Sequence, residues 1–429
     1  MRHSWFFLII FMLGAMSAYS QTQPDSRLQW WQDARFGMFI HWGPISLKGT
    51  EIGWSRGKQV TAEEYDNLYK SFTAEKFSAK DWVSIAKNAG MKYIVLTAKH
   101  HDGFCLWNTE TTDYNIMNTP FGRDVVKELS EECKKQGIAF CTYYSILDWY
   151  QPDYNDFNAQ GGAGYKLPED EKPDMARYMN YLHTHLKELI QNYGPLGIMW
   201  FDGEWEEPWT HEMGLELYDY VRGLQEDIII NNRVDKGRKG MEGVTLSDQH
   251  YAGDYDTPEQ EVGKFQTDRP WESCITIAQQ WAWKPNDKLK TFDECIRILV
   301  ETAGGDGNLL LNVGPMPSGE IEARQVDRLN EIGQWLETNG ESIYGTRGGP
   351  FKPESWGVST SKGNKIYLHI LNINGKNLVL SLLNKKVLKC SLLNGEDIDF
   401  SQSREGISLS LAKLNKKIVD NIIVLELEQ

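Results

Sequence analysis

The sequence lacks the local motifs that mark nucleotide and zinc chemistry. Its 429 residues contain no glycine-rich phosphate loop, no HExxH or CxxC pair and no internal repeat. A phosphate loop needs closely spaced glycines so that backbone N–H groups can surround the anion, and a zinc site needs clustered His or Cys ligands. These absences remove support for nucleotide-dependent enzymes, zinc enzymes and repeat architectures.

The chain has fewer basic than acidic residues, and it has few cysteines. The formal net charge is −15, with 45 Lys and Arg against 60 Asp and Glu. This balance disfavours nucleic acid and anionic membrane surfaces as partners, because both demand clustered cations, and a neutral partner fits better. The few cysteines lack metal-type spacing, and most lie in apolar runs, so we interpret them mainly as buried small hydrophobic residues. They are Cys105, Cys133, Cys141, Cys274, Cys295 and Cys390.

The N-terminus carries an apolar run that is too short to span a bilayer. The run extends from Trp5 to Met16, between a basic start and the small residues Ala18 and Ser20. A membrane-spanning helix needs about 20 apolar residues. The pattern therefore predicts a secretory signal at residues 1–20, cleaved after Ser20, rather than a transmembrane anchor. We expect an exported protein with no membrane insertion once the signal is removed.

Tryptophan, in contrast, is abundant. The chain has 16 tryptophans. Indole faces stack well on the C–H faces of sugar rings, although tryptophan is also ordinary core material. The composition is thus compatible with a sugar as the neutral partner.

The arrangement of apolar segments predicts an α/β fold, a (β/α) barrel of TIM type over residues 21–345. Short strand-like runs alternate with helix-like stretches, as in a parallel sheet wrapped by helices. Expected strands are 36–42, 93–98, 139–145, 197–201, 228–232, 274–277 and 309–313, and expected helices are 79–88, 125–136, 175–191, 215–224, 292–302 and 322–338. After about Pro353 short β-like runs follow one another, which predicts a C-terminal all-β sandwich over residues 346–429.

Unusual polar residues fall where the barrel strands are expected to end. These residues are His41, His100, His101, Tyr143, Tyr144, Asp202 and Arg233. Catalytic groups of such barrels gather at the C-terminal ends of the strands. An ordinary core strand would end in turn residues, so this pattern, repeated at five strands, indicates an active site.

Carboxyl groups near these strand ends suit glycoside hydrolysis. A retaining glycosidase needs one ionised carboxylate to attack the anomeric carbon and a second carboxyl group to protonate the leaving oxygen. Asp202 follows a fully apolar strand and fits the first role, although aspartate also caps turns after strands. Glu259 and Glu272 both lie beside bulky apolar residues that can raise a carboxyl pKa, as a general acid requires. The residues by themselves leave the choice between these two glutamates open.

The adjacent histidines point to polar contacts in the same pocket. Neighbouring residues of a strand face opposite sides, and His100 and His101 rarely would both enter an apolar core. With His41 they are compatible with a metal site, and equally with neutral imidazoles that bond sugar hydroxyls. We favour the second interpretation and expect no metal.

Taken together, these residues give the chain a resemblance to the α-L-fucosidase family of retaining glycoside hydrolases. The similarity extends over nearly the whole expected mature sequence and rests on several blocks in the family's order. The blocks are residues 35–44 (RFGMFIHWGP), 93–104 (YIVLTAKHHDGF), 143–145 with 148–149, 200–203 (WFDG), 232–233, 270–272 (PWE), 307–315 (GNLLLNVGP) and 339–345 (NGESIYG).

The resemblance implies a catalytic (β/α) barrel with a β-sandwich, no cofactor, and fucosylated oligosaccharides or glycoconjugates as substrates. It assigns Asp202 as the nucleophile, with Glu259 as our choice for the acid/base and Glu272 as second choice. It also implies a set of residues that hold the fucose ring, with two further tryptophans as apolar walls. The ring-binding set is His41, His100, His101, Tyr144, Trp200 and Arg233, and the walls are Trp54 and Trp281.

Two loops depart from the family pattern. A Glu-Trp pair found in other members is matched only by Gly53-Trp54 with Glu51 nearby, and a frequent Trp-Gly-Tyr is replaced by Trp281-Ala-Trp283. Linkage preference is therefore not assigned. The alternatives are a retaining glycosidase for another sugar, or a carbohydrate-binding protein of this fold that has lost catalysis. The signal and the resemblance together predict the periplasm of a Gram-negative bacterium as the location.

Overall fold

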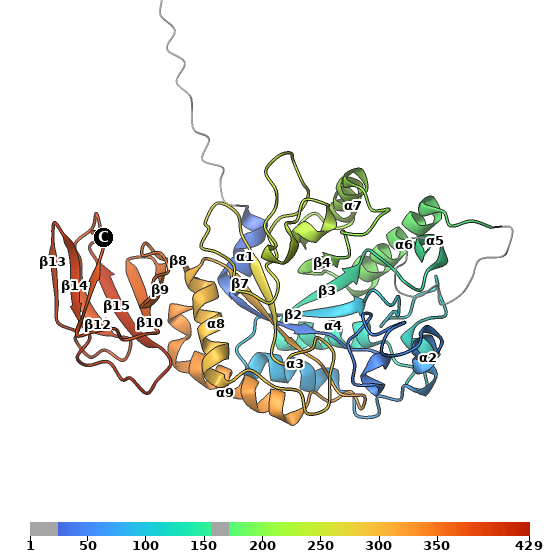
Figure 1. The fold of residues 1–429 in the computed structure, drawn as a ribbon, viewed down its shortest axis with the longest axis horizontal. Coiled ribbons are helices and arrows are strands. Elements are labelled where there is room, and N and C mark those ends of the chain that lie inside the picture. Colours follow the sequence, from blue (N-terminus) through green and yellow to red (C-terminus); the bar gives the residue numbers. More distant parts are fainter. Residues whose placement is uncertain (1–24, 156–170) are drawn as a thin grey trace, which may run out of the picture.

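The computed structural model describes residues 25–155 and 171–429 (Figure 1). The predicted signal at residues 1–20 lies outside the described residues. No helix in the described ranges is long and apolar enough to cross a bilayer. All six cysteines are buried and unpaired, which confirms their interpretation as small core residues.

A curled parallel sheet of seven strands forms the core of the barrel. Its strands follow the order β5-β4-β3-β2-β1-β7-β6. Their bounds are β1 (Phe36–Ile40), β2 (Tyr93–Lys99), β3 (Ala139–Ser145), β4 (Ile198–Asp202), β5 (Ile229–Ile230), β6 (Glu272–Thr276) and β7 (Asn308–Val313). Every predicted barrel strand is present, with ends shifted by a few residues.

An irregular segment closes the ring between the two edge strands. Residues 255–259 make parallel bridges to Asn231 just after β5 through Tyr255, to Trp271 just before β6 through Asp256, and to β6 itself through Glu259. The N–H of Asn232 bonds the carbonyl of Tyr255 at 2.9 Å, and the N–H of Cys274 bonds that of Pro258 at 3.0 Å. The segment thus takes the place of an eighth strand, and it carries Glu259 to the barrel rim.

Helices cover the outside of the sheet, and most of them begin at a Ser, Thr or Asp whose side chain caps the first turn. Asp124 caps the helix that ends at Gly137, whose φ of 74° makes it a left-handed C-cap. Thr291 and Glu294 form a reciprocal capping box. The helices are α1 (Ser26–Ala34), α2 (Ala62–Asn67), α3 (Ala79–Asn88), α4 (Val125–Gln136), α5 (Pro152–Asn155), α6 (Met175–Tyr193), α7 (His211–Leu224), α8 (Phe292–Gly304) and α9 (Ala323–Asn339).

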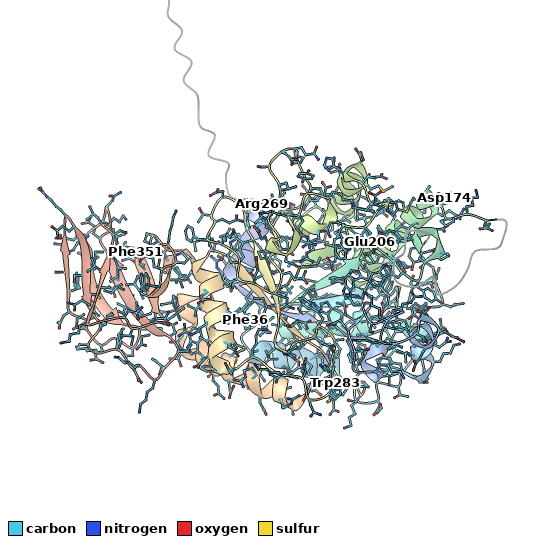
Figure 2. All side chains as sticks on the ribbon, viewed as in Figure 1. Phe36, Asp174, Glu206, Arg269, Trp283 and Phe351 are labelled. Carbon is cyan, nitrogen blue, oxygen red and sulfur yellow. The ribbon has the colours of Figure 1, made fainter. Side chains whose placement is uncertain are left out.

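Antiparallel sheets make up the C-terminal region, as predicted. One sheet has the order β12-β15-β10-β9-β8 and the other β11-β14-β13. The strands are β8 (Arg347–Gly348), β9 (Gly357–Lys362), β10 (Lys365–Ile370), β11 (Asn377–Leu380), β12 (Val387–Leu392), β13 (Phe400–Ser403), β14 (Gly406–Ser410) and β15 (Asn421–Leu427). Figure 2 labels Phe351 in this region and Phe36 in the barrel, and the two residues belong to separate hydrophobic cores.

The sandwich packs against the outer helices rather than against the barrel mouth (Figure 1). A Cβ on Gly304 of α8 would lie 2.4 Å from a methyl carbon of Val358 in β9, so the close approach requires glycine there. Arg297 of α8 also donates to the carbonyl of Leu371 at 2.7 Å. This docking leaves the C-terminal ends of the barrel strands accessible.

Candidate active site

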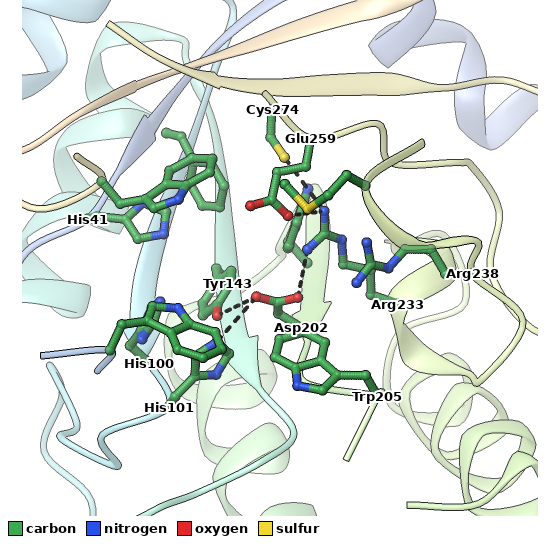
Figure 3. Close-up of a pocket in the computed structure, with 15 residues that line it drawn as sticks. His41, His100, His101, Tyr143, Asp202, Trp205, Arg233, Arg238, Glu259 and Cys274 are labelled. Carbon is green, nitrogen blue, oxygen red and sulfur yellow. Dashed lines mark hydrogen bonds and ion pairs between the residues drawn. The ribbon is translucent and has the colours of Figure 1, made fainter. Parts of the chain in front are cut away.

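A pocket of about 230 Å³ opens at the C-terminal ends of the barrel strands (Figure 3). It contains every sequence-predicted site residue except Tyr144 and Glu272. The predicted residues that line it are His41, Trp54, His100, His101, Trp200, Asp202, Arg233, Glu259 and Trp281. Residues from strands that are far apart in sequence therefore meet at one site, as the strand-end pattern predicts.

Asp202 lies at the last position of β4 and is 8% exposed. Its Oδ1 accepts a hydrogen bond of 2.7 Å from Arg233, and its Oδ2 accepts one of 3.0 Å from the Tyr143 hydroxyl. Burial by itself raises the pKa of Asp202, but Arg233 and the other positive groups nearby outweigh it and hold the pKa below its ordinary value. The carboxylate is therefore ionised at neutral pH and available as a nucleophile.

Arg233 joins Asp202 to a second carboxylate. Its Nη2 donates to Oε2 of Glu259 at 2.9 Å, while its Nε bonds the Thr257 hydroxyl at 2.9 Å. The guanidinium also lies 4.7 Å from the centre of the Trp200 ring. Burial lowers the pKa of Arg233, yet the two carboxylates raise it well above its ordinary value, so the cation stays charged. The planar guanidinium of Arg233 thus holds the carboxyl groups of Asp202 and Glu259 at a fixed separation.

The three histidines line the pocket as neutral rings. Burial lowers the pKa of His41 to about 3 and that of His101 to about 4, and it places the pKa of His100 well below its ordinary value. The Nδ1 of His41 is hydrogen-bonded to the Asn312 side chain at 2.6 Å, and that of His101 to the Ser145 hydroxyl at 2.7 Å. Neutral imidazoles held in this way can donate to or accept from sugar hydroxyls.

No group of three His, Cys, Asp or Glu side chains placed to hold a metal ion occurs within the described part of the chain. The Nδ1 atoms of His41 and His101 are already bonded, and the Nε2 of His101 lies 3.6 Å from Oδ2 of Asp202.

Aromatic side chains form the apolar walls. Trp54 is 38% exposed, and its ring meets that of Trp149 edge-on at 5.2 Å. Trp281 is held through its backbone, because its N–H donates to Oε2 of Glu51 at 3.0 Å and that of Ala282 donates to Oε1 at 3.0 Å. The glutamate that sequence reasoning placed only near the first loop is therefore an anchor for one wall.

The placement of Tyr144 is a correction to the prediction. Its hydroxyl is hydrogen-bonded to His185 at 3.0 Å, in the layer between the sheet and the helices. Adjacent residues of a strand face opposite sides, so only one of the two tyrosines can reach the barrel interior. That residue is Tyr143, which pairs in register with Trp200 and packs with it in the interior cluster.

Glu272 does not reach the pocket either. It is the first residue of β6, is fully buried, and accepts hydrogen bonds of 3.1 Å from the indoles of Trp31 and Trp200 and a further one from Tyr93. Burial raises its pKa to about 7, although these donors oppose the shift. The first residue of a barrel strand lies at the end of the barrel opposite the pocket. Glu272 therefore accepts a hydrogen bond from the Trp200 indole instead of facing a substrate.

Sequence reasoning missed several pocket residues. They are Phe39, Trp205, Arg238, Met241 and Cys274, and Tyr143 was placed at a strand end without a role in the site. The alternation along each strand could have identified Phe39, two positions before His41, and Tyr143. Trp205, Arg238 and Met241 come from loops, where no periodicity exists to reveal which side chain turns inward.

Comparison with known proteins shows that the chain is similar to the members of one family. A sequence profile described as alpha-L-fucosidase matches residues 16–341. Tissue alpha-L-fucosidase of Macaca fascicularis is 29% identical over 414 residues, which cover 86% of this chain and 83% of the relative.

Solved structures of α-L-fucosidases are similar to this chain as well. Alpha-L-fucosidase isoenzyme 1 from Paenibacillus thiaminolyticus is 34% identical with a TM-score of 0.83, over 94% of this chain and 99% of that one. A trapped covalent intermediate of a Bacteroides thetaiotaomicron alpha-L-fucosidase, in complex with 2-fluoro-fucosyl fluoride, is 28% identical with a TM-score of 0.83, over 95% of this chain and 97% of that one.

Proposed function

Because this chain belongs to the α-L-fucosidase family of glycoside hydrolases, we propose that it removes terminal α-L-fucose from glycans by retaining double displacement. Asp202 is the nucleophile and Glu259 is the acid/base. The observation that carries the proposal is the single guanidinium of Arg233, which bonds both carboxylates at 2.7 and 2.9 Å. Such close carboxyl groups suit a retaining enzyme, in which they lie roughly 5–5.5 Å apart, better than the wider spacing of inverting enzymes.

The first step forms a bond between an oxygen of Asp202 and the anomeric carbon of fucose. The bond from that carbon to the glycosidic oxygen breaks, and Glu259 transfers its proton to the departing oxygen. The trapped covalent intermediate of the similar Bacteroides enzyme supports this step. Tyr143 and Arg233 fix the carboxylate of Asp202 so that one oxygen can face the anomeric carbon.

In the second step water attacks the anomeric carbon, Glu259 accepts a proton from that water, and the bond to Asp202 breaks. Fucose leaves with retained configuration, and both carboxyl groups return to their starting forms. The neutral histidines supply hydrogen bonds to ring hydroxyls without adding charge. The walls of Trp54 and Trp281 suit the methyl group that fucose carries on C5, where galactose has a hydroxymethyl group. An apolar wall of this kind discriminates by only about 1–3 kcal/mol.

Export to the periplasm of a Gram-negative bacterium completes the proposal. The basic start and the apolar run from Trp5 to Met16 are features of a secretory signal and support export. Expression in such a host followed by cell fractionation and intact-mass measurement tests it. A periplasmic protein that begins at Gln21 is the expected result, and an uncleaved chain in the cytoplasm would contradict it.

The test of mechanism is hydrolysis of 4-nitrophenyl α-L-fucoside by the mature protein and by Asp202→Ala, Glu259→Ala and Glu272→Ala. We expect wild-type release, loss of activity in the Asp202 variant, and azide rescue of both the Asp202 and Glu259 variants. The rescued product should be the inverted fucosyl azide for Asp202→Ala and the retained azide for Glu259→Ala, because azide replaces the nucleophile in one and attacks the covalent intermediate in the other.

Other outcomes would contradict specific parts of the proposal. Azide rescue of Glu272→Ala with a retained product, without rescue of Glu259→Ala, would move the acid/base role to Glu272. Release from another aryl glycoside but not from the fucoside would assign a different sugar. A folded wild-type protein that releases nothing from either would indicate a binding protein that has lost catalysis.

A further inference from the structure

A second cleft lies where the β-sandwich meets the barrel, next to α8 (Figure 1). Its volume is about 450 Å³, and no described residue lines both this cleft and the catalytic pocket. The barrel contributes the segment 262–265 and residues at the end of α8, and the C-terminal region contributes residues 352–354, 357–358 and 371–372. The proposed mechanism uses none of them.

Glu301 exposes an unpaired carboxylate to this cleft. It lies in the last turn of α8, where the helix dipole disfavours negative charge. Within the described part of the chain its side chain forms no hydrogen bond or ion pair, and burial raises its pKa although Arg297 opposes the shift. Arg297, one turn earlier, instead donates to the carbonyl of Leu371 at 2.7 Å and to the Asn372 side chain at 3.4 Å. A partly buried carboxylate without a donor is costly, so a ligand that donates hydrogen bonds would account for it.

The charged side chains around the cleft balance one another. Among the described residues that line it, two are basic and two are acidic: Lys264, Lys352, Glu301 and Glu354. A net anion would be repelled by the carboxylates and a net cation by the ammonium groups. The lining therefore favours a neutral ligand whose groups both donate and accept hydrogen bonds, as hydroxyl groups do.

Apolar groups form much of the remaining lining. Val358 and Leu371 are buried, and the ring of Phe265 is partly exposed. This ring packs close to Gly348, where an added Cβ would lie 3.2 Å from it, and the Nζ of Lys352 lies 5.8 Å from its centre. Apolar surface beside hydrogen-bonding groups suits a pyranose, which combines C–H faces with hydroxyls.

We infer that this cleft is a second saccharide-binding site, which holds a neutral disaccharide. Glu301 accepts hydrogen bonds from ring hydroxyls, Lys352 donates to a sugar oxygen, and the apolar groups contact the C–H faces. The cleft has about twice the volume of the catalytic pocket, about 450 against 230 Å³, so two sugar rings fit where that pocket takes one. Neither Asp202 nor Glu259 lines the cleft, so the site binds a glycan without cleaving it. The inference goes beyond the proposed function and does not depend on it.

Lactose is the probe for this site, because it is a neutral disaccharide without fucose. Saturation-transfer difference NMR of the mature protein, with excess L-fucose added to fill the catalytic pocket, reports binding elsewhere. We expect saturation transfer to lactose that persists in excess fucose. Glu301→Gln should raise the Kd for lactose about tenfold, because hydrogen bonds to a charged acceptor are stronger than those to a neutral one. Lys352→Ala, at an exposed position, should also weaken binding.

Glu337→Gln is the matched control, because this glutamate is exposed near the end of α9 and does not line the cleft. It should leave the Kd for lactose unchanged, and all three variants should hydrolyse the aryl fucoside like the wild type. Loss of the lactose signal in excess fucose, equal Kd values in the wild type and Glu301→Gln, or no transfer to lactose would each overturn the site. Lactose binding that depends on Glu301, in a wild type that does not hydrolyse the fucoside, would support the site and refute the proposed function.

Discussion

The Nη1 atom of Arg233 donates a 2.7 Å hydrogen bond to Oδ1 of Asp202, and both side chains are almost fully buried. Inside a pocket of low polarity such a charge-assisted contact is stronger than at the surface. It is the main attraction that keeps the buried carboxylate ionised. The consequences of this pairing can be measured.

Replacing Arg233 by lysine should reduce kcat/KM by roughly 10²–10³ fold, because an ammonium cannot bond both carboxylates in a fixed plane. Burial would then raise the pKa of Asp202 with less opposition. Activity requires the ionised nucleophile, so the acid limb of the kcat/KM profile should move to higher pH. Measurement of kcat/KM against pH on the aryl fucoside checks both effects, and an unmoved acid limb would contradict the role of Arg233.

The two adjacent tyrosines should behave differently when each loses its hydroxyl. Tyr143→Phe removes a hydrogen bond to the ionised Asp202 and should lower kcat/KM by about tenfold or more, since bonds to charged groups contribute about 1.5–3 kcal/mol. Tyr144→Phe removes the contact to His185 and should lower the free energy of unfolding by about 1 kcal/mol with kcat/KM close to wild type. Steady-state kinetics combined with urea unfolding separates the two, and the reverse pattern would restore Tyr144 to the site.

Glu272 should make stability depend on pH. Its pKa is about 7 in the folded protein against 4.5 for the ordinary side chain, so the folded state holds a proton that the unfolded chain has released between these values. The free energy of unfolding from this group therefore falls as pH rises from 4.5 to about 7, in total by about 3 kcal/mol.

The variant Glu272→Gln tests this linkage. It removes the titrating group, so the difference in unfolding free energy between wild type and variant should favour the wild type most at low pH. Above pH 7 that difference should stop changing. Urea unfolding at a series of pH values measures it, and a difference that stays constant across the range would show that Glu272 does not titrate there.

Chelation should leave the enzyme active. In the described part of the chain no three His, Cys, Asp or Glu side chains are placed to hold a metal ion. Incubation of the mature protein with EDTA, followed by dialysis and assay on the aryl fucoside, is the measurement. A loss of activity that added zinc restores would instead support the metal alternative.

Much of this fold was predictable because it depends on local patterns. Apolar runs of strand length alternate with helical periodicity, and the strands and helices predicted from them are present. The strand-end rule also located Asp202, Arg233 and the histidines at one site, because parallel strands in a barrel all end at the same rim. The residues by themselves offered both Glu259 and Glu272 as the second carboxyl group, and only the resemblance favoured Glu259, which lies on an irregular segment.

Which side chains face the pocket depended on three-dimensional packing. A sequence with two adjacent tyrosines does not say which one faces the interior, and the register of β3 against β4 selects Tyr143. The sequence also could not separate Glu272 from Glu259. In the structure Glu272 is the first residue of β6 and lies away from the pocket, whereas Glu259 lines the pocket.

Local composition and periodicity thus predicted the barrel, its strand ends and the position of Asp202 at the rim of the pocket. Tertiary structure alone decided which segment closes the ring, which guanidinium bonds both carboxylates, and which tryptophans line the pocket. The physical reason is that periodicity reports only how a segment buries its own apolar face. The distances between side chains from distant segments are set when those segments pack together.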